Sequence, residues 1–236
     1  MTPHLILGGA VSNIYTNSTG ENDSSVSGTS FGAELYGLYT LPKWTFTGTA
    51  MVGHLGNRAT RYLPNIGAGK FTTNGVYGGA SVRADYNWLD HAHLFVTPYA
   101  GLSYLYTNTG NGQETGLNGP IDMNMHYGRV SNSLAQANAG LTTGYRTAIR
   151  YGTLTSWVSL GGLGTLGNTH TRVQETLGLS SGSVTSQVAS TGAFTPAVGV
   201  QLAGQSTPWK LAANWQGQFA NRASDQAFTL QGSYKF

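Results

Sequence analysis

The sequence has 236 residues, of which only 9% are charged and 39% are hydrophobic, and its net charge is +3. Ordinary soluble domains carry about 25% charged residues, yet no run of about 18 apolar residues is present, which excludes a protein that spans a membrane with helices. The 12 basic residues are scattered along the chain, a pattern that is not typical of nucleic-acid binding. Cysteine is absent, so neither a disulfide nor a thiolate metal site is available.

Polarity alternates with period two from the first segments onward. In "TSFGAELYGLYTL", residues 29–41, apolar side chains occupy every second position and polar or small ones occupy the positions between them. Pro42 and Lys43 then form a tight turn. The following "WTFTGTAMVGH", residues 44–54, alternates in the same way, so these two segments predict a β-hairpin.

The same pattern recurs to the end of the chain. It predicts ten strands, at about 4–15, 29–41, 44–54, 73–88, 93–106, 133–147, 152–166, 195–204, 209–220 and 227–236. Short turns near 42, 90, 149 and 206 alternate with long polar segments near 16–28, 55–71, 108–131 and 168–194, which we expect to be loops. Long loops at one rim and short turns at the other are typical of bacterial outer-membrane barrels.

These features together predict an all-β fold, namely a transmembrane antiparallel up-and-down β-barrel with ten strands in this chain, located in the bacterial outer membrane. The 26 aromatic residues (13 Tyr, 8 Phe and 5 Trp) suffice for girdles at the two membrane interfaces. A soluble β-sandwich is the alternative, but its outer faces would be charged, whereas the polar faces here consist of Thr, Ser, Asn, Gln, Tyr and Gly.

Candidate functional residues follow from strand parity and from position. Charges on the polar face of their strands are expected to line the lumen, because charges that face lipid are costly; they are Glu34, Arg83, Asp85, Arg146 and Lys210. Tryptophans beside the short turns, Trp44, Trp88 and Trp209, are expected to form an aromatic girdle at the lipid headgroups. The terminal Phe236 is expected to be an interface anchor.

Residues 210–236, "KLAANWQGQFANRASDQAFTLQGSYKF", resemble the last two strands of the autotransporter β-domain, the translocator of type V secretion. Gly217, Phe219, the turn at 221–226 and the ending Gly232, Tyr234 and Phe236 carry this resemblance, and "FVTPYAGLSYLY" (95–106) is similar to a central strand of the family. Members of that family have twelve strands preceded by a helix in the pore, and the opening of this sequence looks like their third and fourth strands. The ten strands either close by themselves or form most of a larger barrel.

The resemblance implies a pore or translocator that anchors a covalently linked passenger and supplies its aqueous route. It also implies that Tyr234 and Phe236 belong to a terminal signal read by the barrel assembly machinery. We expect a monomer, in contact with outer-membrane lipid, that occupies residues 1–236 as one translocator domain. The opening "MTPHLILGG" lacks the features of a secretory signal, so we expect upstream sequence to precede it in the natural protein.

Other chemistry has weaker support. "GLGTLG" (162–167) matches a dinucleotide fingerprint but lies within a predicted strand, where glycines let the strand coil. His91 and His93 lack a third ligand, so we expect no metal and no cofactor. A hydrolase of the omptin type is the rival function, with loop candidates Asp122, His126, His170 and Glu175. A small porin is a third hypothesis, and we expect the protein not to be an enzyme.

Overall fold

The computed structural model describes all residues except 1–3, 21–23, 92, 118–122, 167–169, 178–179, 188–191, 205–208, 222 and 235–236. The described residues form strands and connections, and none of them belongs to a helix that could cross a bilayer. The strands are β1 (His4–Thr19), β2 (Ser25–Thr40), β3 (Trp44–Leu63), β4 (Gly67–Tyr86), β5 (Leu89–His91), β6 (Leu94–Thr109), β7 (Gly112–Gln113), β8 (Met125–Tyr127), β9 (Val130–Ile149), β10 (Gly152–Leu166), β11 (His170–Leu177), β12 (Ser180–Gln187), β13 (Gly192–Phe194), β14 (Ala197–Gly204), β15 (Trp209–Ala220) and β16 (Ala223–Tyr234).

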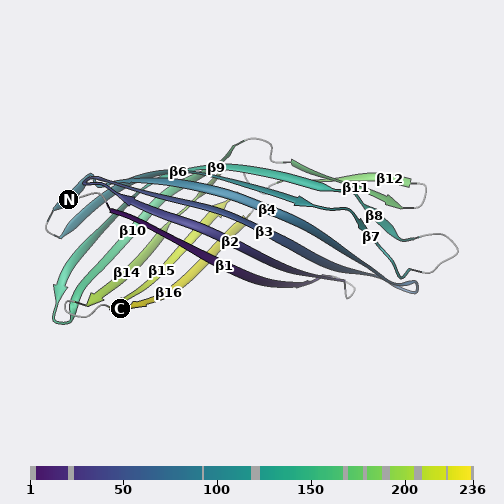
Figure 1. Ribbon diagram of the computed structural model, residues 1–236, viewed down its shortest axis with the longest axis horizontal. Coiled ribbons are helices and arrows are strands. Elements are labelled where there is room, and N and C mark those ends of the chain that lie inside the picture. The colour runs from purple at the N-terminus through teal and green to yellow at the C-terminus, as the bar shows by residue number, and fades with distance from the viewer. Residues whose placement is uncertain are drawn as a thin grey trace.

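Twelve of these strands form one antiparallel sheet in which neighbours in sequence are neighbours in space (Figure 1). β5 pairs with β6 beyond the end of β4, and β13 and β14 both lie between β10 and β15, so the twelve strands occupy ten positions. This arrangement confirms the predicted all-β, up-and-down fold and the ten strand positions. The motif at 162–167 lies in β10 as far as its described residues extend.

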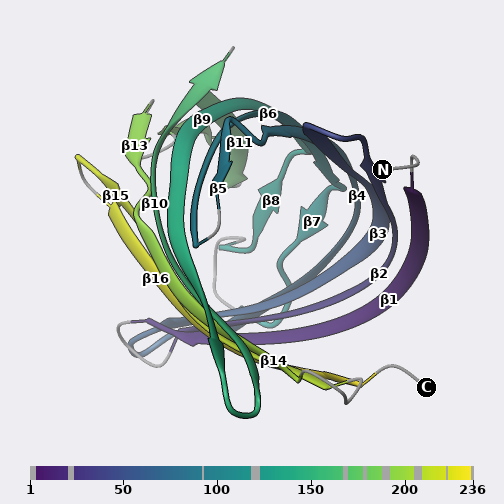
Figure 2. The same cartoon turned by 90° about the vertical axis from the view of Figure 1, so that its left-hand side faces the viewer.

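The sheet curls around a central lumen, as Figure 2 shows in a view along the strands. Among the described residues, β1 pairs only with β2 and β16 pairs only with β15, so these two strands form the edges of the curled sheet.

Aromatic side chains on the concave face lie across glycines of neighbouring strands. A Cβ on Gly53 would overlap the ring of Tyr77, and Cβ atoms on Gly140 or Gly161 would overlap the hydroxyl of Tyr99. Because a glycine has no side chain, a large ring can lie flat across the adjacent strand there. The same contact recurs between Tyr36 and Gly8, Phe95 and Gly144, and Trp157 and Gly199. These aromatic rings fill the inner side of the wall.

The convex face of the wall is apolar and uncovered. Leu35 is 70% exposed and Val52 is 64% exposed, and Val82, Leu102, Val200 and Leu211 are also exposed. A surface of this kind needs a nonaqueous neighbour, because monomeric soluble proteins rarely expose large contiguous apolar patches. The outer membrane expected from the sequence would provide such a neighbour.

The prediction that 55–71 is a loop is wrong. β3 and β4 continue past the apolar part of the wall and meet at a turn of residues 64–66, with Asn65 at φ 65°. Segments 16–28 and 168–194 also contain more strand than predicted. Their polar, Thr- and Gly-rich composition resembles that of a loop, but antiparallel pairing depends on the backbone and tolerates such side chains at polar surfaces.

A second, four-stranded sheet with the order β12-β11-β8-β7 lies beyond the wall at the loop rim. β7 and β8 lie at the loop end of the sheet in Figure 1, and inside the outline of the curled sheet in the view along the strands (Figure 2). Four of the six described side chains classed as buried, Ala59, Thr73, Glu114 and Leu117, lie where this layer meets the inner face of β3 and β4. Most of the buried side chains among the described residues therefore lie at the loop rim, beyond the end of the apolar wall.

Candidate translocation lumen

The concave face of the sheet holds a cavity of about 650 Å³ between β4, β6, β9, β10 and the last three strand positions. Its lining is mostly polar or aromatic and includes Arg83, Tyr99, Asn138, Trp157, Gln216 and Asp225. Strand alternation explains this composition, since residues of one parity share one face. The cavity is thus a water-accessible surface on the reverse side of the apolar wall.

Arg83 and Asp85 form the charged centre of this face. Arg83 donates hydrogen bonds to Asp85 Oδ1 from Nε at 3.1 Å and from a terminal nitrogen at 2.7 Å. Its guanidinium also lies 3.9 Å from the ring centroid of Tyr99, in a cation–π contact. Thr47, Ser81 and Ser103 surround the pair and contribute hydroxyl groups.

Two amide oxygens on the described part of this sheet, Asn138 Oδ1 and Asn214 Oδ1, are shielded from solvent and lack a hydrogen-bond partner. Asn138 also lines the cavity. An unpaired buried acceptor is costly, so these two amides stand out among the described polar groups of the sheet.

The remaining predicted lumen charges do not join this centre. Arg146 forms an ion pair with Asp90 in the turn segment and lies over the ring of Phe95 at 4.5 Å. Glu34 is in register with Ala10 and Met51, and Lys210 with Ala203 and Ser233. The structure therefore brings together Arg83 and Asp85 and leaves the other three apart.

The predicted girdle residues lie at the turn side of the wall. Trp44 begins β3, and its ring centroid is 4.7 Å from that of Tyr86 on β4. Trp88 precedes β5 and is 69% exposed, and Trp209 begins β15 in register with Tyr234. Phe236 lies outside the described residues.

The turn segment before β6 is fixed to β9 by polar contacts. Hydrogen bonds from Arg146 and Asn87, together with the Arg146 charge, hold the pKa of Asp90 below its usual range despite a small opposing effect of burial. The Nδ1 atom of His93 is 2.9 Å from the carbonyl oxygen of Arg146, and its ring stacks on Tyr145. Across the described residues no group of three His, Asp or Glu side chains has a metal-binding arrangement.

The residues proposed for a hydrolase do not form a described catalytic group. His126 lies in β8, in register with Gln113 and Thr176. His170 and Glu175 lie in β11, and Asp122 falls outside the described residues.

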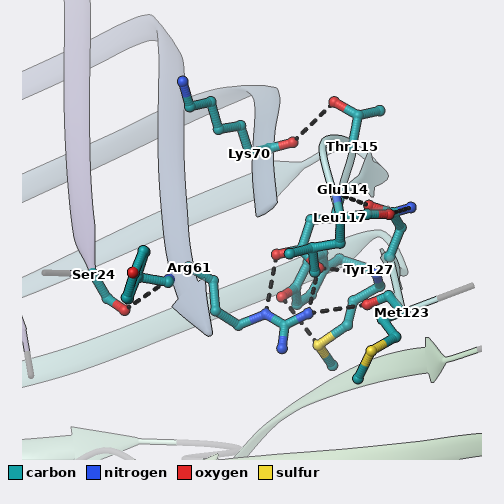
Figure 3. Close-up of polar contacts among 11 residues, drawn as sticks. Ser24, Arg61, Lys70, Glu114, Thr115, Leu117, Met123 and Tyr127 are labelled. Carbon is teal, nitrogen blue, oxygen red and sulfur yellow. Dashed lines mark hydrogen bonds and ion pairs between the residues drawn. The ribbon is translucent and has the colours of Figure 1, made fainter. Parts of the chain in front are cut away.

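Sequence reasoning missed a buried ion pair at the loop rim. Glu114, whose side chain is fully buried, accepts a hydrogen bond from Arg61 Nε at 3.0 Å, a second from an Arg61 terminal nitrogen, and a third from the Met125 backbone amide at 3.0 Å (Figure 3). Arg61 also donates to the Met123 carbonyl at 3.2 Å. The pair joins β3 to the segment between β6 and β9, 53 residues away, so no local signal predicts it.

Glycine and amide contacts complete this rim cluster. A Cβ on Gly69 would overlap the Glu114 carboxylate, so only glycine leaves room for that side chain. The side chain of Asn124 bonds to both the amide and the carbonyl of Leu117, each at 3.2 Å. These contacts fasten the inner layer to the rim of the wall.

Residues 1–216 match the model of the autotransporter β-domain family. Among solved structures, the transport unit of the autotransporter AIDA-I from Escherichia coli is similar over 98% of this chain and 89% of that chain, with 13% identity and a TM-score of 0.27, a likeness too weak to add to the family match. No curated protein sequence matches the chain.

Proposed function

The chain belongs to the autotransporter β-domain family, and we propose that the polar cavity on its concave face is the route of a covalently linked passenger segment. Members of this family are translocators in the bacterial outer membrane rather than enzymes. The observation that supports the specific route is the division of one sheet into an exposed apolar face and a polar concave face. Strands whose backbone groups are paired with neighbouring strands can cross a lipid bilayer, because unpaired backbone groups are costly there.

In this proposal Arg83 and Asp85 bind polar groups of the passing chain toward the turn end of the wall, where β4 ends at Tyr86. Glu34, Arg146 and Lys210 contribute further charges along the same face. Weak, exchangeable contacts of this kind suit a route, because a segment that is bound too tightly does not leave.

A crosslinking experiment tests the route. Asn138→Cys should form a disulfide with a cysteine placed in the linker between passenger and β-domain, in cells, while the passenger is being exported. Ala139→Cys is the matched control, because it is the next residue of β9 and lies on the opposite face. Crosslinking at Ala139→Cys, or absence of crosslinking at Asn138→Cys, would contradict the proposal.

Ion selectivity provides a second test. Arg83→Glu should shift the selectivity of the pore toward cations in planar bilayers, because it reverses a charge on the lumen face. Arg58→Glu, an exposed position on β3 outside the cavity lining, should leave selectivity unchanged. Equal shifts in both variants would mean that the current does not pass along this cavity.

We further propose that residues 1–236 act as one monomeric domain in contact with outer-membrane lipid, assembled by the barrel assembly machinery. A single sheet that runs from β1 to β16 supports one domain. In this proposal Tyr234 and Phe236 form the assembly signal and interface anchor, and Trp44, Trp88 and Trp209 form the aromatic girdle.

Phe236→Ala should refold in detergent but accumulate poorly in the outer membrane of cells, measured by heat-modifiable migration. Normal accumulation would remove the signal role.

A further inference from the structure

The outer face of β3 changes from apolar to polar and basic between Val52 and His54. Its outward residues run through Phe46, Ala50 and Val52, then continue with His54 and Arg58. The register continues this boundary across the sheet, since His54 is opposite Val76 and Val76 is opposite Asn108. The apolar surface therefore ends along a row of neighbouring strands, on the side of the loop rim.

A shallow groove of about 440 Å³ lies at this boundary. Its side chains include His54, Asn74, Asn108, Asn111 and Arg129, and no carboxylate lines it. Arg129 donates from Nε to Asn108 Oδ1 at 2.9 Å, which fixes the guanidinium at the groove. A groove of amide, imidazole and guanidinium groups is suited to an anion with several acceptor oxygens.

Two more cations stand next to the groove on the same outer face. Arg58 is opposite Thr72, so Lys70 is its diagonal neighbour across the strand pair, at about 7–8 Å. Both are exposed, and Figure 3 shows the Lys70 side chain extending away from Glu114. Among the described residues, the carboxylates in ion pairs bind other arginines, Glu114 with Arg61, Asp85 with Arg83 and Asp90 with Arg146, so none of these pairs neutralises this face.

An apolar groove of about 690 Å³ lies on the membrane side of the boundary, across β1, β2 and β3. Small residues, Gly9, Ala33 and Ala50, alternate there with larger ones, Val11, Leu35 and Val52. Val11, Ala33 and Val52 form one row across β1, β2 and β3, and the next outward residue of β3 after Val52 is His54. The two grooves thus adjoin at β3, where apolar Val52 is followed by His54, so a lipid lying diagonally across β3 would place its acyl chain in the apolar groove and its headgroup in the polar one.

We propose that this face, defined by His54, Asn74, Asn108, Arg129, Arg58 and Lys70, binds the phosphate groups of a lipid in the outer leaflet, with an acyl chain in the apolar groove. The adjoining apolar groove favours a lipid over free phosphate. The loop rim of an outer-membrane barrel is its external side, which assigns the lipid to the outer leaflet. Basic residues at this depth attract anionic headgroups.

The test measures retention of a bisphosphorylated lipid A by protein purified from outer membranes, using native mass spectrometry. Arg129→Ala should retain about fivefold less of this lipid, and Arg58→Ala combined with Lys70→Ala should lose more, about fivefold per cation. Arg150→Ala, an exposed arginine at the opposite, turn rim, is the matched control and should retain the wild-type amount. Heat-modifiable migration confirms that each variant is folded.

Two further probes separate the sources of phosphate. The same glycolipid without phosphates should be retained weakly and equally by wild type and variants, and inorganic phosphate should not bind. The proposal would be overturned if Arg150→Ala lost as much lipid as Arg129→Ala, or if Arg129→Ala retained the wild-type amount. It would also be overturned if the lipid without phosphates were retained as strongly as the bisphosphorylated lipid, or if inorganic phosphate alone were bound.

Discussion

β3 and β4 have opposite inside-outside patterns in two parts of their length. In the wall, Val52 is 64% exposed on the convex face, and the concave face is polar. In the rim extension, Ala59 and Thr73 on the inner face are covered to within 8% and 7% exposure, while Arg58 and Lys70 on the outer face are exposed. The same antiparallel ladder thus runs continuously through both parts.

The difference shows that the surroundings, and not the strand pairing, set the pattern of burial. In a membrane, an apolar face needs no second protein layer to remove it from water. Beyond the membrane both faces meet water, and one must be covered by protein to gain from burial. The segment between β6 and β9 provides that cover, and the Arg61–Glu114 pair holds it.

The largest effect is expected from filling a glycine in the wall. Gly140→Leu should prevent assembly, at a cost of about 3 kcal/mol or more, because its side chain would overlap the Tyr99 hydroxyl and the backbone of β10. Gly164→Leu is the control, since nothing lies within 4 Å of its Cβ position. Heat-modifiable migration should be lost in the first variant only. Normal migration of Gly140→Leu would show that the wall can move to accept a side chain.

The next effect concerns the rim. Arg61→Ala should destabilise the inner layer locally by about 3 kcal/mol, because it leaves the buried Glu114 carboxylate without its cation. Hydrogen exchange should accelerate at 110–117 and stay unchanged in the wall. Arg58→Ala removes a charge from the outer face of the same strand, and it should change the exchange rate neither at 110–117 nor in the wall. Faster exchange throughout the wall would contradict the separation of the two parts.

The third prediction tests the packing of Glu114 against Gly69 without removing a charge. Gly69→Ala should cost about 1–3 kcal/mol of rim stability, because the added Cβ displaces Glu114. Gly48→Ala should be tolerated, because the added Cβ would be 3.7 Å from the Ser81 carbonyl oxygen, an ordinary van der Waals distance. Limited proteolysis of the segment between β6 and β9 distinguishes the two variants. Equal resistance would mean that Glu114 finds another position without loss.

The smallest effect is expected at the turn rim. Asp90→Asn removes an ion pair whose side chains are 45% and 42% exposed, so the cost at neutral pH should be below about 1 kcal/mol. Because folding lowers the pKa of Asp90, its contribution should be complete above about pH 4, the ordinary range of Asp, and be lost as pH falls through the lowered pKa. Denaturation of wild type and Asp90→Asn should therefore converge in acid. A constant difference at all pH values would exclude this titration as the cause.

Much of the wall could be predicted from the sequence. Period-two alternation in segments such as 44–54 predicts strands and assigns each residue a face, and Pro42 marks a turn. Strand length was less predictable, because residues 55–63 are polar like a loop but pair with β4 throughout. A polar strand in water and a polar loop have similar compositions.

The candidate site was only partly predictable. Parity put Arg83 and Asp85 on one face, and the structure adds that they bond to each other. The same reasoning could not find that Arg146 binds Asp90, 56 residues away in the turn, nor that Arg61 binds Glu114. Alternation gives the face of a residue and not its partner.

The sequence by itself determined the all-β class, the strand order and the division into apolar and polar faces, because these depend on local alternation and on turns between neighbours. Only the tertiary structure decided which ring lies over which glycine, which strands form the edges of the sheet, and where the segment between β6 and β9 packs. It also gathered Arg58, Lys70 and Arg129, scattered in the sequence, on one outer face. These relations depend on register and curvature across several strands, which no single segment encodes.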